Sequence, residues 1–106
     1  MISTLKKIFG IGPKVEYAEL VKQGAIILDV RTKGEYSGGH IKGSINISVD
    51  ALSKNLSQFK DKQKPIITCC ASGMRSASAK SILKSKGFTN VHNGGSWNGL
   101  QQKIGK

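Results

Sequence analysis

The sequence predicts an α/β fold, a three-layer sandwich in which helices flank a central, mostly parallel sheet of four to five strands. Apolar runs alternate with segments of helical periodicity along the 106 residues, without an internal repeat. The two clearest apolar runs, at 25–30 and 65–69, do not alternate apolar and polar side chains, as is typical of parallel strands buried on both faces. A chain of this length predicts one small domain rather than two.

The first half of the chain predicts a helix, a strand, a short helix and a second strand. Apolar side chains at helical spacing over residues 16–22 precede Gly24, a common helix terminator. The apolar run at 25–30 is the first strand, and Thr32–Glu35 after it has the S/T-x-x-E form of a capping box. A glycine-bearing loop then leads into a short strand over residues 44–47.

The second half predicts three more helices and two more strands. Ser48 or Asp50 caps a helix whose apolar stripe is Leu52, Leu56 and Phe59. The remaining expected elements are a strand over residues 65–69, a helix over 75–86, a strand over 89–92, a turn at Gly94-Gly95 and a helix over 96–104.

The charge balance is strongly basic. Seventeen Lys and Arg residues against six Asp and Glu give a formal net charge of +11 and a pI near 10.0, which by itself suggests a polyanionic partner. However, the sequence has no recognised nucleic-acid-binding motif, and only 6% of its residues are aromatic, without a stacking cluster among basic ones. We therefore expect no nucleic-acid partner, and we expect the lysines to form a solvated basic surface.

The two cysteines and two histidines argue against a disulfide scaffold or a metal site. Cys69 and Cys70 are neighbours and cannot close a stabilising loop. No C-x-x-C motif occurs, and His40 and His92 lie in unrelated segments. We therefore expect neither a metal nor another cofactor.

The amino terminus predicts a lead-in segment, residues 1–13, before a domain over residues 14–106. A lead-in helix packed on the domain is the favoured interpretation, with a short amphipathic membrane anchor as the alternative. Lys6 and Lys7 interrupt any apolar run of signal-peptide length, and no segment reaches transmembrane length. With free thiols, these features predict a cytoplasmic protein without a membrane partner. We expect the protein to be a monomer.

The segment from Cys70 to Ser76 is the candidate functional site. It lies between a predicted buried strand and a predicted helix, where open parallel sheets bind ligands. A loop of small residues with one glycine can turn several N–H groups toward one point, and the helix that follows adds its positive dipole end. Arg75 adds a full positive charge. Such surroundings stabilise a thiolate, so we predict that Cys70 is a nucleophile.

Cys69 is predicted to play a different part from its neighbour. It lies inside the apolar run and is expected to face the core as a small hydrophobe, which is the ordinary role of a free cysteine. A role as a resolving or accessory thiol is the alternative for this residue.

Five segments together resemble the successive signatures of single-domain rhodanese-like sulfurtransferases. This resemblance implies a rhodanese-like sandwich in which Cys70 carries sulfur as a persulfide. The segments are Asp29-Val-Arg31, Glu35, Gly39–Ile47, Cys70–Ser76 and Gly87–Val91.

The implied activity is that of a thiosulfate sulfurtransferase. The Cys70 thiolate would attack the sulfane sulfur of a small anionic donor such as thiosulfate, and cyanide, a thiol or a thioredoxin-like protein would accept the sulfur. The N–H groups of the loop would hold the persulfide anion, in the manner of an oxyanion hole. The loop residues expected to bind substrate are Ala71, Ser72, Gly73, Met74, Arg75 and Ser76.

Other polar residues in the matching segments are expected to be structural. Asp29, Arg31 and Glu35 are predicted to form ion pairs and caps that set the loop geometry. His40 is expected to be a hydrogen-bonded structural residue, because transfer of sulfane sulfur needs little proton chemistry once the thiolate exists. Arg75 has two possible roles: attracting an anionic donor, or forming an ion pair that braces the loop.

Two alternative functions stay open at this point. A cysteine-dependent phosphatase or arsenate reductase also uses a thiolate, a cradle of N–H groups and an arginine. Four residues separate Cys70 from Arg75, one fewer than in that class. The smaller loop is better suited to bind a single sulfur atom than a tetrahedral oxyanion. The second alternative is a non-catalytic sulfur-relay binding module, which would not need the intact cysteine loop.

Overall fold

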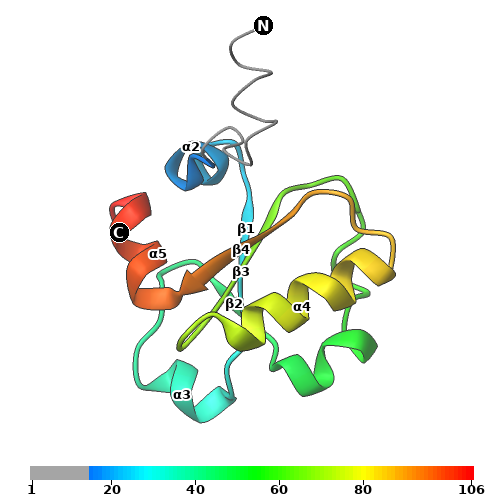
Figure 1. Ribbon diagram of the computed structural model, residues 1–106, viewed down its shortest axis with the longest axis horizontal. Coiled ribbons are helices and arrows are strands. Elements are labelled where there is room, and N and C mark those ends of the chain that lie inside the picture. Colours follow the sequence, from blue (N-terminus) through cyan, green and yellow to red (C-terminus); the bar gives the residue numbers. More distant parts are fainter. Residues whose placement is uncertain (1–14) are drawn as a thin grey trace, which may run out of the picture.

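The computed structural model describes residues 15–106 and has helices on both sides of one sheet (Figure 1). The predictions for residues 1–13 lie outside this part of the chain. Among residues 15–106, no helix is long and apolar enough to cross a membrane. The elements, in chain order, are α2 (Tyr17–Lys22), β1 (Ile26–Asp29), α3 (Lys33–Ser37), β2 (Ile45–Asn46), the 3₁₀ helix η1 (Val49–Lys54), β3 (Ile66–Cys70), α4 (Met74–Ser85), β4 (Val91–Ser96) and α5 (Trp97–Ile104).

The sheet described in residues 15–106 has four strands in the order β2-β1-β3-β4, and every neighbouring pair is parallel. The central pair aligns Ile26 with Ile66 and Asp29 with Cys69. This arrangement confirms the predicted α/β fold and its parallel sheet. It also brings the carboxyl ends of all four strands to one edge, where β3 leads into α4.

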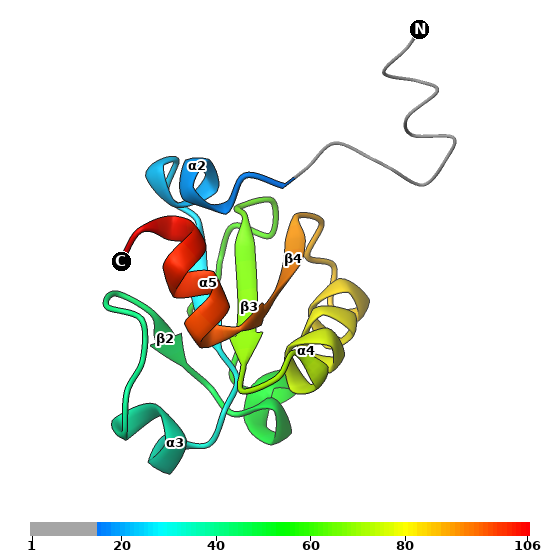
Figure 2. The ribbon, with the colours of Figure 1, turned by 60° about the vertical axis from the view of Figure 1, so that its left-hand side comes forward.

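Each face of the sheet has its own apolar core. On one side, α4 and η1 pack on Leu28, Val30 and Ile66. On the other side, α2 and α5 pack on Ile27 and Ile67. Figure 2 shows α5 and α4 on opposite sides of β3. Successive strand residues point to opposite faces, so an unbroken apolar run supplies both cores at once.

The predicted helix after Ser48 is shorter than expected. It is a single 3₁₀ segment that ends at Lys54, and Ser48 at its N-cap makes no side-chain cap hydrogen bond. Leu56 and Phe59 therefore lie beyond the helix, although both still pack on the α4 side of the sheet. Phe59 meets Phe88 edge to face, with ring centroids 6.5 Å apart. The apolar stripe was predicted correctly as core, but its helical extent was wrong, because irregular backbone also carries these side chains inward.

The predicted turn at Gly94-Gly95 is also wrong, since both residues belong to β4. A Cβ atom at Gly94 would lie 2.8 Å from Ile67 Cγ2 and 2.9 Å from the carbonyl oxygen of Thr68. Glycine is therefore required for close approach of β4 to β3 rather than for a turn. The register between the two strands shifts between Thr68 and Cys70, so that Cys70 aligns with Ser96.

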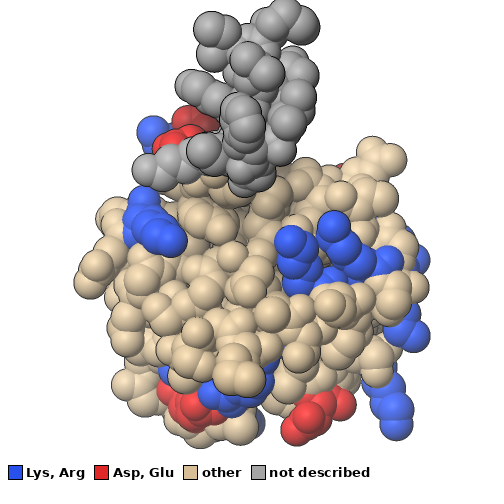
Figure 3. Space-filling model, in the orientation of Figure 1, with Lys and Arg blue, Asp and Glu red and all other residues tan. Residues whose placement is uncertain are grey.

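Basic side chains are spread over several elements, as expected for a solvated surface. Figure 3 shows them in separate groups on one face, the largest over and beside α4. The described residues from 51 onward carry ten of the seventeen basic residues of the chain and one of its six acidic residues. The positive charge is therefore concentrated in the half of the chain that includes β3 and α4.

Candidate active site

Cys70 is the last residue of β3 and is fully buried, with 0% of its surface exposed. The strand was predicted to end one residue earlier, at Cys69, so the expected loop position of Cys70 is corrected by one residue. Cys70 remains in the ladder because β4 bulges and pairs Ser96 with it. The two cysteines point to opposite faces: Cys70 belongs to the α4-side core and Cys69 to the α5-side core.

The Cys70 sulfur accepts hydrogen bonds from two backbone N–H groups of the segment that follows. Gly73 N lies 3.0 Å and Ser76 N lies 3.4 Å from Sγ. Gly73 has φ +103°, a left-handed conformation that residues other than glycine rarely adopt. In this conformation its N–H points at the sulfur. A nest of N–H groups at the first turn of a helix is an environment for an anion.

The two thiols have opposite electrostatic surroundings. For Cys70, burial opposes the thiolate most strongly, but hydrogen bonds from Ser76, Gly73 and Ser72 outweigh it and lower the pKa of the thiol. For Cys69, burial and the nearby Asp29 carboxylate raise the pKa to about 12. The predicted division of roles, with Cys70 ionisable and Cys69 a core residue, agrees with this geometry.

The candidate substrate-binding residues occupy the turn between β3 and α4 and the first turn of α4. Ala71 and Ser72 are exposed, and Met74 is 80% exposed, the most exposed large hydrophobic side chain in residues 15–106. Ser76 is buried. The structure brings the N–H groups of Gly73 and Ser76 to the sulfur, whereas it shows no such hydrogen bond to Sγ from Ala71, Met74 or Arg75.

Arg75 forms an ion pair that braces the loop. Its two terminal nitrogens donate to the carboxylate oxygens of Glu35 at 2.7 and 2.9 Å, in a two-pronged contact between α4 and α3. Arg75, followed by the backbone N–H of Thr32, lowers the pKa of Glu35 to about 2. Of the two roles predicted for Arg75, the structure shows the bracing one, since its guanidinium is engaged by a carboxylate. The capping box between Thr32 and Glu35 is confirmed.

Asp29 and Arg31 form a predicted ion pair, with Arg31 Nη2 2.7 Å from Asp29 Oδ2, and the structure shows that both residues are buried. The same guanidinium donates to the carbonyl oxygen of Gly39 at 2.7 Å and lies 4.7 Å from the centre of the Trp97 ring. This side chain therefore joins the end of β1 to the loop before β2 and to α5. These contacts agree with the predicted structural role.

His40 lies beside α3. Its Nδ1 is 2.8 Å from the carbonyl oxygen of Tyr36, and its ring stacks on the Tyr36 ring with centroids 3.7 Å apart. These contacts agree with a structural histidine. His92 is likewise engaged, with Nε2 2.8 Å from Asn90 Oδ1. Among residues 15–106, no group of three His, Cys, Asp or Glu side chains could hold a metal ion.

Two polar residues beside the site were not identified from the sequence. Thr68 Oγ1 donates to the carbonyl oxygen of Ser76 at 2.9 Å, and Asn93 Oδ1 accepts from Ser76 Oγ at 2.6 Å. Both come from strands that flank the loop. Thr68 is a polar residue inside an expected strand, and Asn93 directly follows another expected strand. Neither position says which distant group the side chain contacts.

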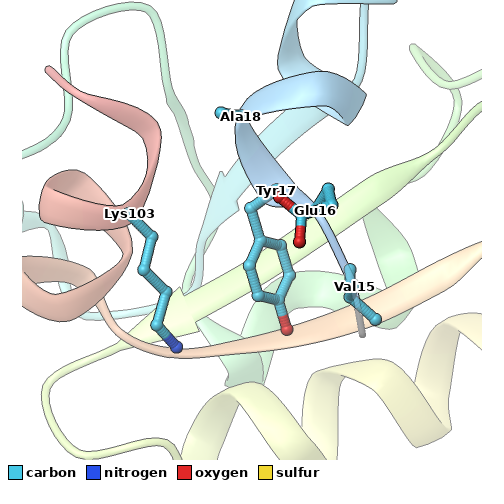
Figure 4. A pocket seen from close by; sticks show the side chains of 5 residues that line it. All are labelled: Val15, Glu16, Tyr17, Ala18 and Lys103. Carbon is cyan, nitrogen blue, oxygen red and sulfur yellow. The ribbon is translucent and has the colours of Figure 1, made fainter. Parts of the chain in front are cut away.

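The hollow shown in Figure 4 lies away from the cysteine, between α2 and α5, with a volume of about 400 Å³. The Tyr17 ring points from α2 toward β4 in this view, and its hydroxyl donates to the carbonyl oxygen of Asn93 at 3.0 Å. The hollow therefore lies beside the hydrogen bond between Tyr17 and β4, and its lining does not include Cys70. Its lining residues are Val15, Glu16, Tyr17, Ala18 and Lys103.

The family model and the relatives that match this chain all point to the same protein family. A family model described as "Rhodanese-like domain" matches residues 14–103. The rhodanese domain-containing protein CG4456 of Drosophila melanogaster is 44% identical, in an alignment that covers 74% of this chain and 84% of that protein. Thiosulfate sulfurtransferase GlpE of Pseudomonas fluorescens is 33% identical over 81 residues, covering 73% and 71% of the two chains.

A solved structure shares the same fold over most of the chain. The human single-domain sulfurtransferase TSTD1 matches with a TM-score of 0.73 and 26% sequence identity, covering 87% of this chain and 97% of that one. The parallel sheet, the flanking helices and a cysteine at the end of β3, just before α4, agree with the features that the resemblance implied. By its sequence and its fold, this chain belongs to the rhodanese-like domain family.

Proposed function

We propose that this protein is a sulfurtransferase of the thiosulfate type, in which Cys70 carries the transferred sulfur as a persulfide. The observation that supports this most directly is the Cys70 sulfur held by the N–H groups of Gly73 and Ser76, with its pKa lowered. The similarity to proteins named thiosulfate sulfurtransferase supports the reaction class.

The proposed reaction has two half-reactions on one sulfur nucleophile. The Cys70 thiolate attacks the outer sulfur of thiosulfate, an S–S bond forms, and the sulfur–sulfur bond of the donor breaks as sulfite leaves with its electron pair. The protein then holds the anion Cys70–S–S⁻. A nucleophilic acceptor, cyanide in an assay or a thiolate in a small molecule or thioredoxin-like protein, attacks the outer sulfur and releases the Cys70 thiolate.

The first turn of α4 is suited to hold the added sulfur. The first N–H groups of a helix have no partner within the helix, and Met74, Arg75 and Ser76 are the first three residues of α4. The helix is 12 residues long, so its positive dipole end also favours an anion at this point. The persulfide anion would therefore meet N–H groups that the thiolate sulfur alone does not use.

The test is intact-mass analysis after incubation with thiosulfate. We expect the wild-type protein to gain one sulfur, about 32 Da, which cyanide removes as thiocyanate. Cys70→Ala should gain none, whereas the matched control Cys69→Ala should load like the wild type once its fold has been checked by circular dichroism. Loading on Cys69, or loading that survives in Cys70→Ala, would contradict the assignment.

The same preparation separates the two alternative functions. Hydrolysis of an aryl phosphate that depends on Cys70, without uptake of sulfur, would indicate a phosphatase. Neither activity in a folded protein whose Cys70 still reacts with alkylating agents would indicate a binding module. The geometry does not favour a phosphatase, because the Arg75 guanidinium is bound to both carboxylate oxygens of Glu35.

A further inference from the structure

Asn93 lies on β4, outside the cysteine loop in sequence, yet its side chain reaches that loop. Its Oδ1 accepts from Ser76 Oγ at 2.6 Å and from the N–H of Gly95 at 2.9 Å. Its Nδ2 lies 3.4 Å from the carbonyl oxygen of Gly73. The Gly95 N–H can only donate, so the amide oxygen of Asn93, and not its nitrogen, must face Ser76.

The two loop residues that Asn93 contacts are the two that hold the sulfur. Gly73 and Ser76 donate their backbone N–H groups to Cys70 Sγ. Ser76 Oγ also lies 2.9 Å from the carbonyl oxygen of Gly73. The Ser76 hydroxyl has one hydrogen, and the Asn93 oxygen is its nearest acceptor. Two of the backbone N–H groups that stabilise the sulfur therefore belong to residues that Asn93 contacts.

Asn93 is itself held firmly from two sides. The Tyr17 hydroxyl of α2 donates to the backbone carbonyl oxygen of Asn93 at 3.0 Å. The next residue, Gly94, is buried against Ile67 and Leu100 with no room for a side chain. A side chain on such a rigid strand can fix the position of the loop between β3 and α4.

We propose that Asn93 is a positioning residue of the Cys70 site: it ties β4 to Gly73 and Ser76 and so keeps their N–H groups aimed at the sulfur. The inference builds on the proposed sulfur transfer, but the geometry on which it rests concerns only the sulfur and its donors. Without Asn93, the N–H groups are less well fixed, and the thiolate loses part of its stabilisation.

The charged and titratable groups on the elements around the site stay constant in the test. Arg75 of α4 is paired with Glu35 of α3, Cys69 precedes Cys70 on β3, and His92 precedes Asn93 on β4. Asp29 of β1 is paired with Arg31. A substitution of Asn93 by alanine removes no charge, so any shift in the Cys70 titration comes from the hydrogen-bond network.

The experiment measures the rate of Cys70 alkylation by iodoacetamide as a function of pH in wild type, Asn93→Ala and Asn98→Ala. Asn98 is an exposed asparagine on α5 and is the matched control. We expect the midpoint for Asn93→Ala to rise by about one pH unit, so that alkylation and sulfur loading below the midpoint slow by roughly tenfold. Asn98→Ala should follow the wild-type curve. An unchanged or lowered midpoint in Asn93→Ala would overturn the proposal.

A double-mutant cycle separates positioning from a general loss of structure. If Asn93 acts through Ser76, the shift in Ser76→Ala/Asn93→Ala should be smaller than the sum of the shifts in the single variants. Additive shifts would overturn the proposal. If Asn93→Ala does not fold, the uncharged Asn93→Ser shortens the side chain and weakens the same contacts; an unchanged midpoint there would also overturn the proposal. Alkylation needs no sulfur donor, so the alkylation experiment tests the role of Asn93 even if the protein fails to take up sulfur from thiosulfate.

Discussion

At the scale of single residues, adjacent cysteines acquire opposite chemistry because a strand turns successive side chains to opposite faces. Cys69 lies in the core under α5, while Cys70 lies at the end of β3 where the chain bends into α4. Desolvation acts on both thiols, and only Cys70 has N–H donors that outweigh it.

We therefore expect iodoacetamide at neutral pH to modify Cys70 and to leave Cys69 untouched in the folded protein, because only the thiolate is nucleophilic. Intact mass should show one adduct in wild type and none in Cys70→Ala. Modification of Cys69 should appear only when denaturant unfolds the chain. Two adducts on the folded wild-type protein would contradict the difference in pKa between the two thiols.

Glu35 gives a second prediction at this scale, concerning acid stability. Its pKa is lowered to about 2 from 4.5, so its contribution to stability is present above pH 4.5 and is lost as the pH falls through 2. Glu35→Gln lacks this contribution and should have a lower Tm than wild type at pH 6, with the difference shrinking toward pH 2. The exposed Glu16→Gln is the control. A Tm difference that does not change with pH would count against the ion pair as its cause.

At the scale of elements, the site is a junction that several elements hold in place. The strand β3 carries Cys70 at its end, and the first turn of α4 provides N–H groups. Glu35 comes from α3 and Asn93 from β4. Close packing of β4 on β3 is the condition for the last of these contacts.

Gly94→Ala tests that packing. The added Cβ would meet both a side chain and a backbone oxygen of β3 at under 3.0 Å, and overpacking of this kind costs about 1–3 kcal/mol. Thermal unfolding should show a Tm several degrees lower, with slower sulfur loading. Gly34→Ala in α3 is the matched control, because no atom lies within 4 Å of its added Cβ, and it should keep or raise the Tm. Equal Tm values for the two variants would argue against the tight approach.

At the scale of the whole molecule, the positive charge is a property of the surface around α4 more than of the site. Lys80 and Lys84 on α4 lower the pKa of His92, whose burial acts in the same direction and more strongly. The nearest arginine to the sulfur in sequence, Arg75, is already paired. We therefore expect the charge to act on an approaching anion through its long-range field rather than through a contact at Cys70.

We predict that kcat/KM for thiosulfate falls as ionic strength rises from 0.01 to about 0.15 M, because salt screens attraction between a basic surface and an anion. The double variant Lys80→Gln/Lys84→Gln should show a shallower salt dependence, with Lys22→Gln on α2 as the control. Steady-state kinetics over a salt series gives the slopes. A flat profile for wild type would remove steering by charge as a factor.

The sequence by itself determined the features that depend on local pattern. The run from Ala25 to Val30 predicted a doubly buried parallel strand, Thr32–Glu35 predicted the capping box, and the small-residue loop after Cys70 predicted a nest of N–H groups. Each of these needs only near neighbours in the chain, so strand periodicity, helix capping and loop composition suffice to predict it.

Only the tertiary structure decided what depends on residues far apart in sequence. The bulge that keeps Cys70 in the ladder with Ser96, the close contact that requires Gly94, and the hydrogen bond from Ser76 to Asn93 all arise where β4 lies against β3. The same holds for the ion pair between Arg75 and Glu35, which are 40 residues apart in sequence. Register and side-chain pairing across strands follow from packing of the whole sheet, and no local pattern encodes them.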